Sequence, residues 1–155
     1  MNARTVLLLL LAGFVTATVV AAPNLEALRQ GASAGEPWAQ LNLGAAYDHG
    51  QSGLSPNATE AVYWYRLAAE QGIAEAQFNL AHCLATGHGI DQDYLQARIW
   101  MRLAAEQKLA DAQFLLGVML DQGLGGKADP GDAANWLSRA SAQGNEQALQ
   151  YIKNN

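Results

Sequence analysis

The sequence is poor in cysteine, proline and basic residues, and each shortage excludes something. The single cysteine, Cys83, excludes an intrachain disulfide. With 4 prolines and 30 alanines among 155 residues, the composition favours helix, because proline breaks helices and alanine loses no side-chain entropy in them. The 9 lysines and arginines face 14 aspartates and glutamates, so the basic footprint that phosphate binding needs is missing and no nucleic-acid partner is expected.

The one long run without charge lies at the start of the chain. Arg4 is followed by leucines and then by small residues, which are the three parts of a secretory signal peptide. Val19 and Ala21 fit a cleavage site between Ala21 and Ala22, so residues 1–21 are predicted to be removed. The alternative is an uncleaved anchor, since the run is just long enough to span a bilayer. We expect a periplasmic or secreted protein, with no membrane insertion after cleavage.

The rest of the chain repeats itself with a period of about 36 residues. Trp64, Trp100 and Trp136 are each preceded by alanine at three residues and followed by alanine at four. Other residue types recur in the same phase: Gln40, Gln77 and Gln113; Leu43, Leu80 and Leu116; Gly50, Gly87 and Gly123; Gln71, Gln107 and Gln143. A period in this range indicates stacked supersecondary units.

Each unit is predicted to be two helices joined by a loop. Ala61, Trp64 and Ala68 are spaced i, i+3 and i+7, which places them on one face of a helix. Recurrent glycines suit left-handed helix ends, and the expected N-caps are Asn57, Asp91 and Asp129. We therefore expect an all-α solenoid with repeats at 35–72, 73–108 and 109–144, and short capping helices at 22–34 and 145–155.

The predicted core consists of small residues and large ones in alternation. Gly44, Ala81 and Gly117 would let two helices approach closely, and the tryptophans would fill the space between neighbouring units. The expected structural residues are Leu43, Gly44, Tyr47, Trp64, Leu80, Trp100, Leu116 and Trp136.

These motifs resemble the Sel1-like repeat, a relative of the tetratricopeptide repeat. The shared pattern is Ala-Gln, Leu-Gly, Gly-x-Gly, Ala-x-x-Trp, Ala-Ala and Gln-Gly, and it extends from Gly35 to Gly144. Lys108 departs from it by replacing a glycine. The resemblance implies a right-handed superhelix with a concave groove and a role as a protein-binding adaptor. It also implies that exported bacterial members act as scaffolds, envelope regulators or immunity proteins that neutralise toxins.

By the same resemblance, the first helix of each unit lines the concave groove. Leu41, Phe78 and Phe114 would then form an apolar row with an acidic rim, which suits a protein or peptide with a basic surface. The alternative is that Phe78 and Phe114 pack under the next helix. The predicted partner-binding residues are Trp38, Leu41, Asp48, His49, Glu75, Phe78, His82, Asp111, Phe114, Val118 and Asp121.

We expect neither an enzyme nor a cofactor or metal site. Zinc would need His49 and His82 to meet across two helices beside Asp48. Cys83 reads as a buried packing residue, with an intermolecular disulfide as the alternative. The rival function is a cell-wall-directed hydrolase or β-lactam-binding protein, because some cysteine-rich members of the family are linked to β-lactam binding. The candidate serines are Ser52, Ser55, Ser138 and Ser141, and no lysine neighbours them in the sequence.

Overall fold

The computed structural model of the protein describes residues 24–154, and every regular element in that range is a helix. The all-α solenoid predicted from the sequence is therefore confirmed. The predicted signal peptide and its cleavage site lie outside the described residues. The helices are α2 (Leu25–Ser33), α3 (Pro37–His49), α4 (Ala58–Glu70), α5 (Ala74–Thr86), α6 (Tyr94–Glu106), α7 (Ala110–Asp121), α8 (Pro130–Ala142) and α9 (Glu146–Asn154).

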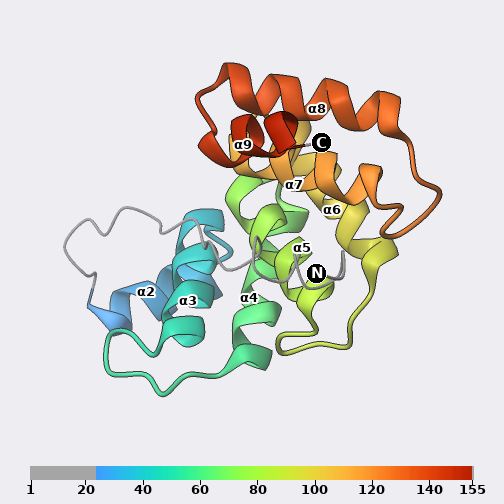
Figure 1. The fold of residues 1–155 in the computed structure, drawn as a ribbon. Coiled ribbons are helices and arrows are strands. Elements are labelled where there is room, and N and C mark those ends of the chain that lie inside the picture. Colours follow the sequence, from blue (N-terminus) through green and yellow to red (C-terminus); the bar gives the residue numbers. More distant parts are fainter. Residues whose placement is uncertain (1–23, 155) are drawn as a thin grey trace.

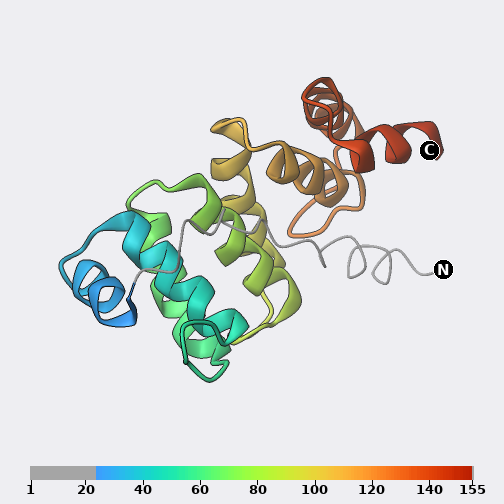
Figure 2. The same ribbon diagram turned by 90° about the vertical axis from the view of Figure 1, so that its left-hand side faces the viewer.

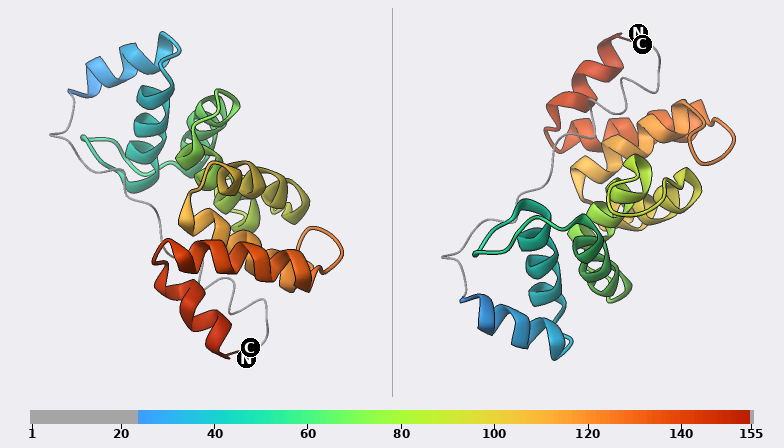
Figure 3. Two further views of the ribbon diagram at one scale, coloured as in Figure 1. Left: turned by 90° about the horizontal axis from the view of Figure 1, so that it is seen from above. Right: turned by 90° about the horizontal axis from the view of Figure 1, so that it is seen from below.

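The helices stack as hairpins in the order of the chain. α3 packs against α4, α5 against α6, and α7 against α8, and each hairpin also contacts the next through α4–α5 and α6–α7 (Figure 1). The array bends into an arc when it is seen from the side (Figure 2). α2 and α9 lie at its opposite ends (Figure 3), where they pack against α3 and α8 respectively. Each repeat thus contacts only its neighbours, as in other solenoids.

The second helix of each hairpin starts at a side-chain cap, whereas α3, α5 and α7 have none. The side chains of Asn57, Asp93 and Asp129 each accept a hydrogen bond from a backbone N–H in the first turn of the helix that follows. The prediction of Asp91 as the cap of α6 is wrong, because the loop from Gly87 runs two residues further before the helix begins. Part of this loop is held by Gln92, whose Nε2 donates to the carbonyl oxygen of Ala85 at 2.7 Å.

The ends of the second helices turn through a left-handed residue. Gly72 and Gly144 have φ of +88° and +84° after α4 and α8. Lys108 occupies the same position after α6 with φ +70°, so it keeps the turn although it replaces the glycine of the pattern.

The tight contact within each hairpin differs from the one expected. Side chains one position beyond the tryptophans, namely Tyr65, Met101 and Leu137, are buried, whereas Trp64 and Trp100 are half-buried. The reason is geometric: adjacent residues on a helix point about 100° apart, so a one-residue shift selects another face. Trp64 instead packs beside the cluster that includes Leu28 and Leu43 at the start of the array.

Two glycines permit the closest of these contacts. A Cβ on Gly44 would lie 2.7 Å from Cδ1 of Tyr65, and a Cβ on Gly117 would lie 2.7 Å from Cγ of Leu137. The expectation that small residues bring the two helices together is therefore right, and the large side chains against them are Tyr65 and Leu137. The other expected core residues differ in burial: Leu43, Leu80, Leu116 and Trp136 are buried, and Tyr47 is half-buried.

Glutamines link each repeat to the one before it. In the first helices, Gln77 and its equivalents are buried, and each donates from Nε2 to a carbonyl oxygen eight residues earlier, at the end of the preceding helix. Each also accepts a hydrogen bond of 2.7 or 2.8 Å from a second glutamine at the end of the next helix. The accepting and donating pairs are Gln40 with Gln71, Gln77 with Gln107, and Gln113 with Gln143. The recurrent glutamines thus give a second donor to buried carbonyl groups that also accept from the backbone, and are themselves hydrogen-bonded.

Candidate partner-binding surfaces

The apolar row predicted for the groove is buried in the structure, which corrects the expectation that it is open to a partner. Leu41, Phe78, Phe114 and Val118 belong to the core cluster, and each is at most 2% exposed. The ring of Phe114 meets Tyr151 of α9 edge-on, with ring centroids 6.2 Å apart. His82 is buried as well. The burial matches the alternative in which the phenylalanines pack beneath neighbouring helices, and their part in partner binding stays a prediction.

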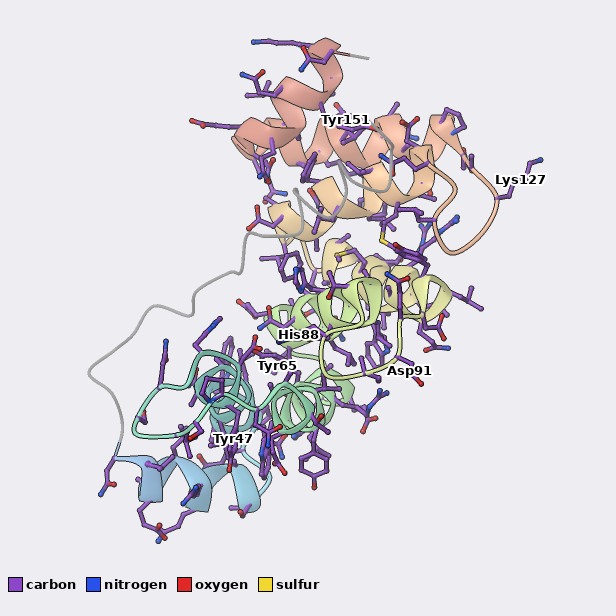
Figure 4. All side chains as sticks on the ribbon, turned by 60° about the horizontal axis from the view of Figure 1, so that its bottom comes forward. Tyr47, Tyr65, His88, Asp91, Lys127 and Tyr151 are labelled. Carbon is purple, nitrogen blue, oxygen red and sulfur yellow. The ribbon has the colours of Figure 1, made fainter. Side chains whose placement is uncertain are left out.

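Three acidic residues predicted for the rim are bonded within the chain. Asp48 has a side chain only 2% exposed, with its Oδ1 lying 2.7 Å from Nε2 of His88 and its Oδ2 accepting from Tyr65. His88 and Tyr65 come from different repeats, and Figure 4 shows them meeting between the first two hairpins. This carboxylate therefore holds repeats together, and little of it is open to a partner.

The other two bonded carboxylates lie near the C-terminal end of the array. Asp111 accepts from Nδ2 of Asn145 at 2.8 Å, and Asp121 accepts from the hydroxyl of Tyr151 at 2.7 Å. Both bonds tie α7 to the last helix and the turn before it. Of the predicted groove residues, Trp38 and His49 are exposed and Glu75 is partly exposed.

Burial governs the titration of the groups at the first interface. It raises the pKa of the Cys83 thiol to about 12, and the nearby Asp48 carboxylate adds to the rise. The pKa of Tyr65 is raised even more, chiefly by burial and then by the same carboxylate. A thiol with so high a pKa stays protonated at neutral pH and is a poor nucleophile. Cys83 is fully buried, as the sequence predicted for a packing residue.

An exposed apolar ridge runs along α6, and the sequence analysis did not identify it. Leu95, Ile99 and Leu103 are 58%, 47% and 39% exposed, and their i, i+4, i+8 spacing aligns them on one face. This face is distinct from the buried one, which carries Ala97 and Met101. The spacing was readable in the sequence, but the repeat pattern drew attention to the other face.

Two arginines and a glycine-rich loop complete a hollow on this ridge, which we call the α6 hollow. Its volume is about 360 Å³, and it is lined by Leu95, Arg98, Ile99, Arg102, Leu103, Gly125 and Gly126. Arg98 donates to the carbonyl oxygen of Lys127 at 3.2 Å, which ties the loop between α7 and α8 to α6. Lys127 itself projects from that loop (Figure 4).

The groups that could bind a metal or act as nucleophiles are spread over the described part of the chain. Within residues 24–154, no group of three or more histidine, cysteine, aspartate or glutamate side chains is placed to hold a metal ion. The candidate serines lie on separate elements, with Ser52 and Ser55 in the α3–α4 loop and Ser138 and Ser141 on α8. No helix in the described part of the chain is both long enough and apolar enough to span a bilayer.

Solved structures share this architecture. A Sel1 repeat protein from Oxalobacter formigenes is 35% identical with a TM-score of 0.76, over 84% of this chain and 97% of that one. The protective antigen c5321 of uropathogenic Escherichia coli is also 35% identical, with a TM-score of 0.80, over 82% of this chain and 27% of that one. Cysteine-rich protein B of Helicobacter pylori shares the fold at 16% identity, with a TM-score of 0.63 over 82% of this chain and 90% of that one.

A curated relative is similar over a shorter stretch. Chitin synthase regulatory factor 3 of Schizosaccharomyces pombe is 39% identical over 64 residues, which are 41% of this chain and 7% of the yeast protein. The Sel1 repeat itself matches three consecutive segments, residues 39–73, 74–109 and 110–145. The chain therefore belongs to the Sel1 repeat family, and its array of three repeats is a protein–protein interaction module.

Proposed function

We propose that this protein is an exported, non-enzymatic binder of a protein or peptide partner. The observation that carries the proposal is the exposed apolar ridge on the central repeat of an interaction solenoid. Folded proteins seldom leave aligned large aliphatic side chains in water without a function, and such patches mark interaction sites.

The proposed compartment rests on the start of the sequence. Arg4, the uncharged run after it and the small residues before Ala22 have the layout of a cleaved export signal. The periplasm, or secretion beyond it, is the destination that such a signal implies. A protective antigen built from the same repeats supports an exported setting.

Within that setting, we favour a dedicated binder such as an immunity protein, or an envelope scaffold or regulator. The yeast relative is named as a regulatory factor, which supports control of another protein through binding. The rival hydrolase finds little support, because the buried thiol of Cys83 is held protonated and no lysine neighbours the candidate serines in the sequence. The binding of a basic partner to the predicted acidic rim also stays a prediction. Three carboxylates of that rim, Asp48, Asp111 and Asp121, are hydrogen-bonded within the chain.

Cell fractionation and partner capture together test the proposal. The tagged full chain is expressed in a Gram-negative host, and the mass of its envelope form is expected to correspond to a start at Ala22. A partner captured from envelope extract is then purified and titrated calorimetrically against the protein, with saturable binding expected. A chain that keeps residues 1–21 in the cytosol would refute export. Turnover of nitrocefin or peptidoglycan, without a titratable partner, would favour the rival.

A further inference from the structure

We propose that the α6 hollow docks an acidic amphipathic helix of the partner protein. The inference rests on the proposed function and adds the place of binding and the chemistry of the bound segment. It differs from the predicted groove in both respects, since the groove was expected to take a basic partner.

The ridge is not a requirement of the repeat. The positions of Leu95, Ile99 and Leu103 are occupied in the third repeat by Gly131, Asn135 and Arg139, one period later. In the first repeat they are Thr59, Tyr63 and Leu67. If stacking needed apolar side chains there, all three repeats would carry them. The central repeat alone presents a full aliphatic ridge, so the ridge serves something other than the fold.

The geometry of the ridge suits a helix. Residues at i, i+4 and i+8 extend over about 12 Å of helix, which is slightly more than two turns. Such a ridge packs into the groove between side-chain rows of a second helix, and recognition of this kind uses apolar anchors at i, i+3 or i+4, and i+7. A partner helix of about three turns therefore covers the exposed parts of Leu95, Ile99 and Leu103.

The charge around the hollow determines the sign of the partner. The chain has a net charge of −5, yet cationic side chains gather here. Arg98 and Arg102 line the hollow, and the guanidinium groups of Arg102 and Arg139 lie 6.0 and 4.6 Å from the ring centroid of Trp136. Asp132 pairs with Nη2 of Arg102 at 3.0 Å, whereas Arg98 lines the hollow and its Nη1 donates to the carbonyl oxygen of Lys127. Guanidinium groups bind carboxylates through paired hydrogen bonds, so glutamates and aspartates suit the flanks of the bound helix.

The wall of the hollow is already in place. Gly125 has φ +75°, and a Cβ there would collide with the carbonyl oxygen of Tyr94 at the start of α6. A Cβ on Gly126 would lie 2.8 Å from Nη1 of Arg98. The loop thus fits closely against α6 because it has no side chains at these two positions. A preformed wall lowers the ordering cost that binding has to overcome.

Two labelled peptides test the proposal with the full chain. Both are 14-residue helices with leucine at i, i+4 and i+7, and their flanks carry glutamate in one and lysine in the other. Fluorescence anisotropy is expected to show the glutamate peptide binding in the range of about 1–100 μM, with the lysine peptide at least about tenfold weaker. Absence of measurable binding by the glutamate peptide, or equal binding by both peptides, would overturn the proposal.

Variants locate the site. Ile99→Glu is expected to weaken the glutamate peptide at least about tenfold, because it places a like charge in the middle of the ridge. Tyr63→Glu is the matched control: Tyr63 holds the equivalent position on α4, is 55% exposed and lies outside the hollow, so binding should be unchanged. Arg98→Glu should reverse the preference between the peptides. Thermal melting by circular dichroism checks that each variant is folded.

Other occupants give different results. Self-association that Ile99→Glu abolishes, measured by light scattering, would assign the ridge to a second copy and overturn the proposal. Binding to phosphatidylglycerol vesicles that Ile99→Glu abolishes, with no binding of the glutamate peptide, would assign it to a membrane surface. The peptide result is independent of partner capture. A captured partner whose affinity is unaffected by Ile99→Glu would refute the α6 hollow as the binding site, while the proposed function would still hold.

Discussion

At the residue scale, stability depends on a few positions where two helices touch. The sequence correctly indicated that Gly44 and Gly117 are contact points, since small residues recur there in phase. It did not show that Tyr65 and Leu137 are the side chains pressed against them. To predict whether a tryptophan or the residue after it makes the contact, one must know how the helix is rotated about its axis. The spacing of the alanines leaves that rotation uncertain by one residue.

Gly117→Ala is expected to destabilise the protein by about 1–3 kcal/mol, the usual cost of overpacking. The added methyl would lie 2.7 Å from Cγ of Leu137, so α7 and α8 would have to move apart. The control is Gly131→Ala in the first turn of α8, where the nearest atom outside the immediate neighbours lies 3.6 Å away. That change should stabilise the helix by about 0.5–1 kcal/mol. Urea denaturation compares the two, and equal effects would contradict the tight contact.

Alkaline pH is expected to destabilise the protein partly through Cys83. Burial raises its pKa from about 9 to about 12, so between these values the unfolded chain loses the thiol proton while the folded chain keeps it. The folded state then loses about 1.4 kcal/mol of stability per pH unit from this group, and none below about pH 9. Cys83→Ala should therefore lose less stability than the native chain between pH 8 and about pH 10.5 in urea denaturation.

The tyrosines do not reverse this comparison. Burial also raises the pKa of Tyr65 and of Tyr151, so both add to the alkaline loss in both proteins. Cys83 is one of the smaller causes of the raised pKa of Tyr65, so removing the thiol lessens the loss from this tyrosine in the same direction. An alkaline loss of the same size in Cys83→Ala and in the native chain would show that the thiol does not titrate as its burial implies.

At the scale of elements, the repeats are joined by polar as well as apolar contacts. One glutamine of each pair donates to a carbonyl group at the end of α2, α4 or α6, which also accepts from the backbone N–H three residues later. Their recurrence was visible in the sequence, but the bonds connect residues about 30 positions apart. These bonds join the first helix of a hairpin to the end of its second helix, so they follow from how the two helices of the hairpin pack together.

Gln77→Ala is expected to cost about 1–3 kcal/mol, because it removes a buried side chain that makes two hydrogen bonds. The carbonyl oxygen of Ala69 would keep only the backbone N–H of Gly72 as a donor, and Nε2 of Gln107 would keep only the carbonyl oxygen of Gly72 as an acceptor. Gln150→Ala on the exposed side of α9 serves as the control and should change stability by less than about 0.5 kcal/mol. Denaturation midpoints that fall equally in both variants would refute the role of the pairing.

At the scale of the whole molecule, the array is expected to be most stable in its middle. Every residue from Ala76 to Ala85 of α5 is buried, and α7 is buried almost as fully, whereas α9 buries only Ala148. In a solenoid each repeat is stabilised by its neighbours, so the ends open first. Hydrogen exchange should be slowest in α5 and α7 and fastest in α2 and α9. Uniform protection along the chain would instead mean that the array unfolds as one unit.

The sequence by itself determined the repeat, the all-helical fold and most helix ends. Period, caps and turn glycines are local signals, because each acts through residues within a few positions of one another in the chain. Only the tertiary structure decided which face of each helix is buried, that Asp48, Asp111 and Asp121 bond within the chain, and that a second apolar face of α6 stays open. Each of these depends on the angle and rotation at which one helix packs on another, and many sequences with the same period satisfy that packing differently.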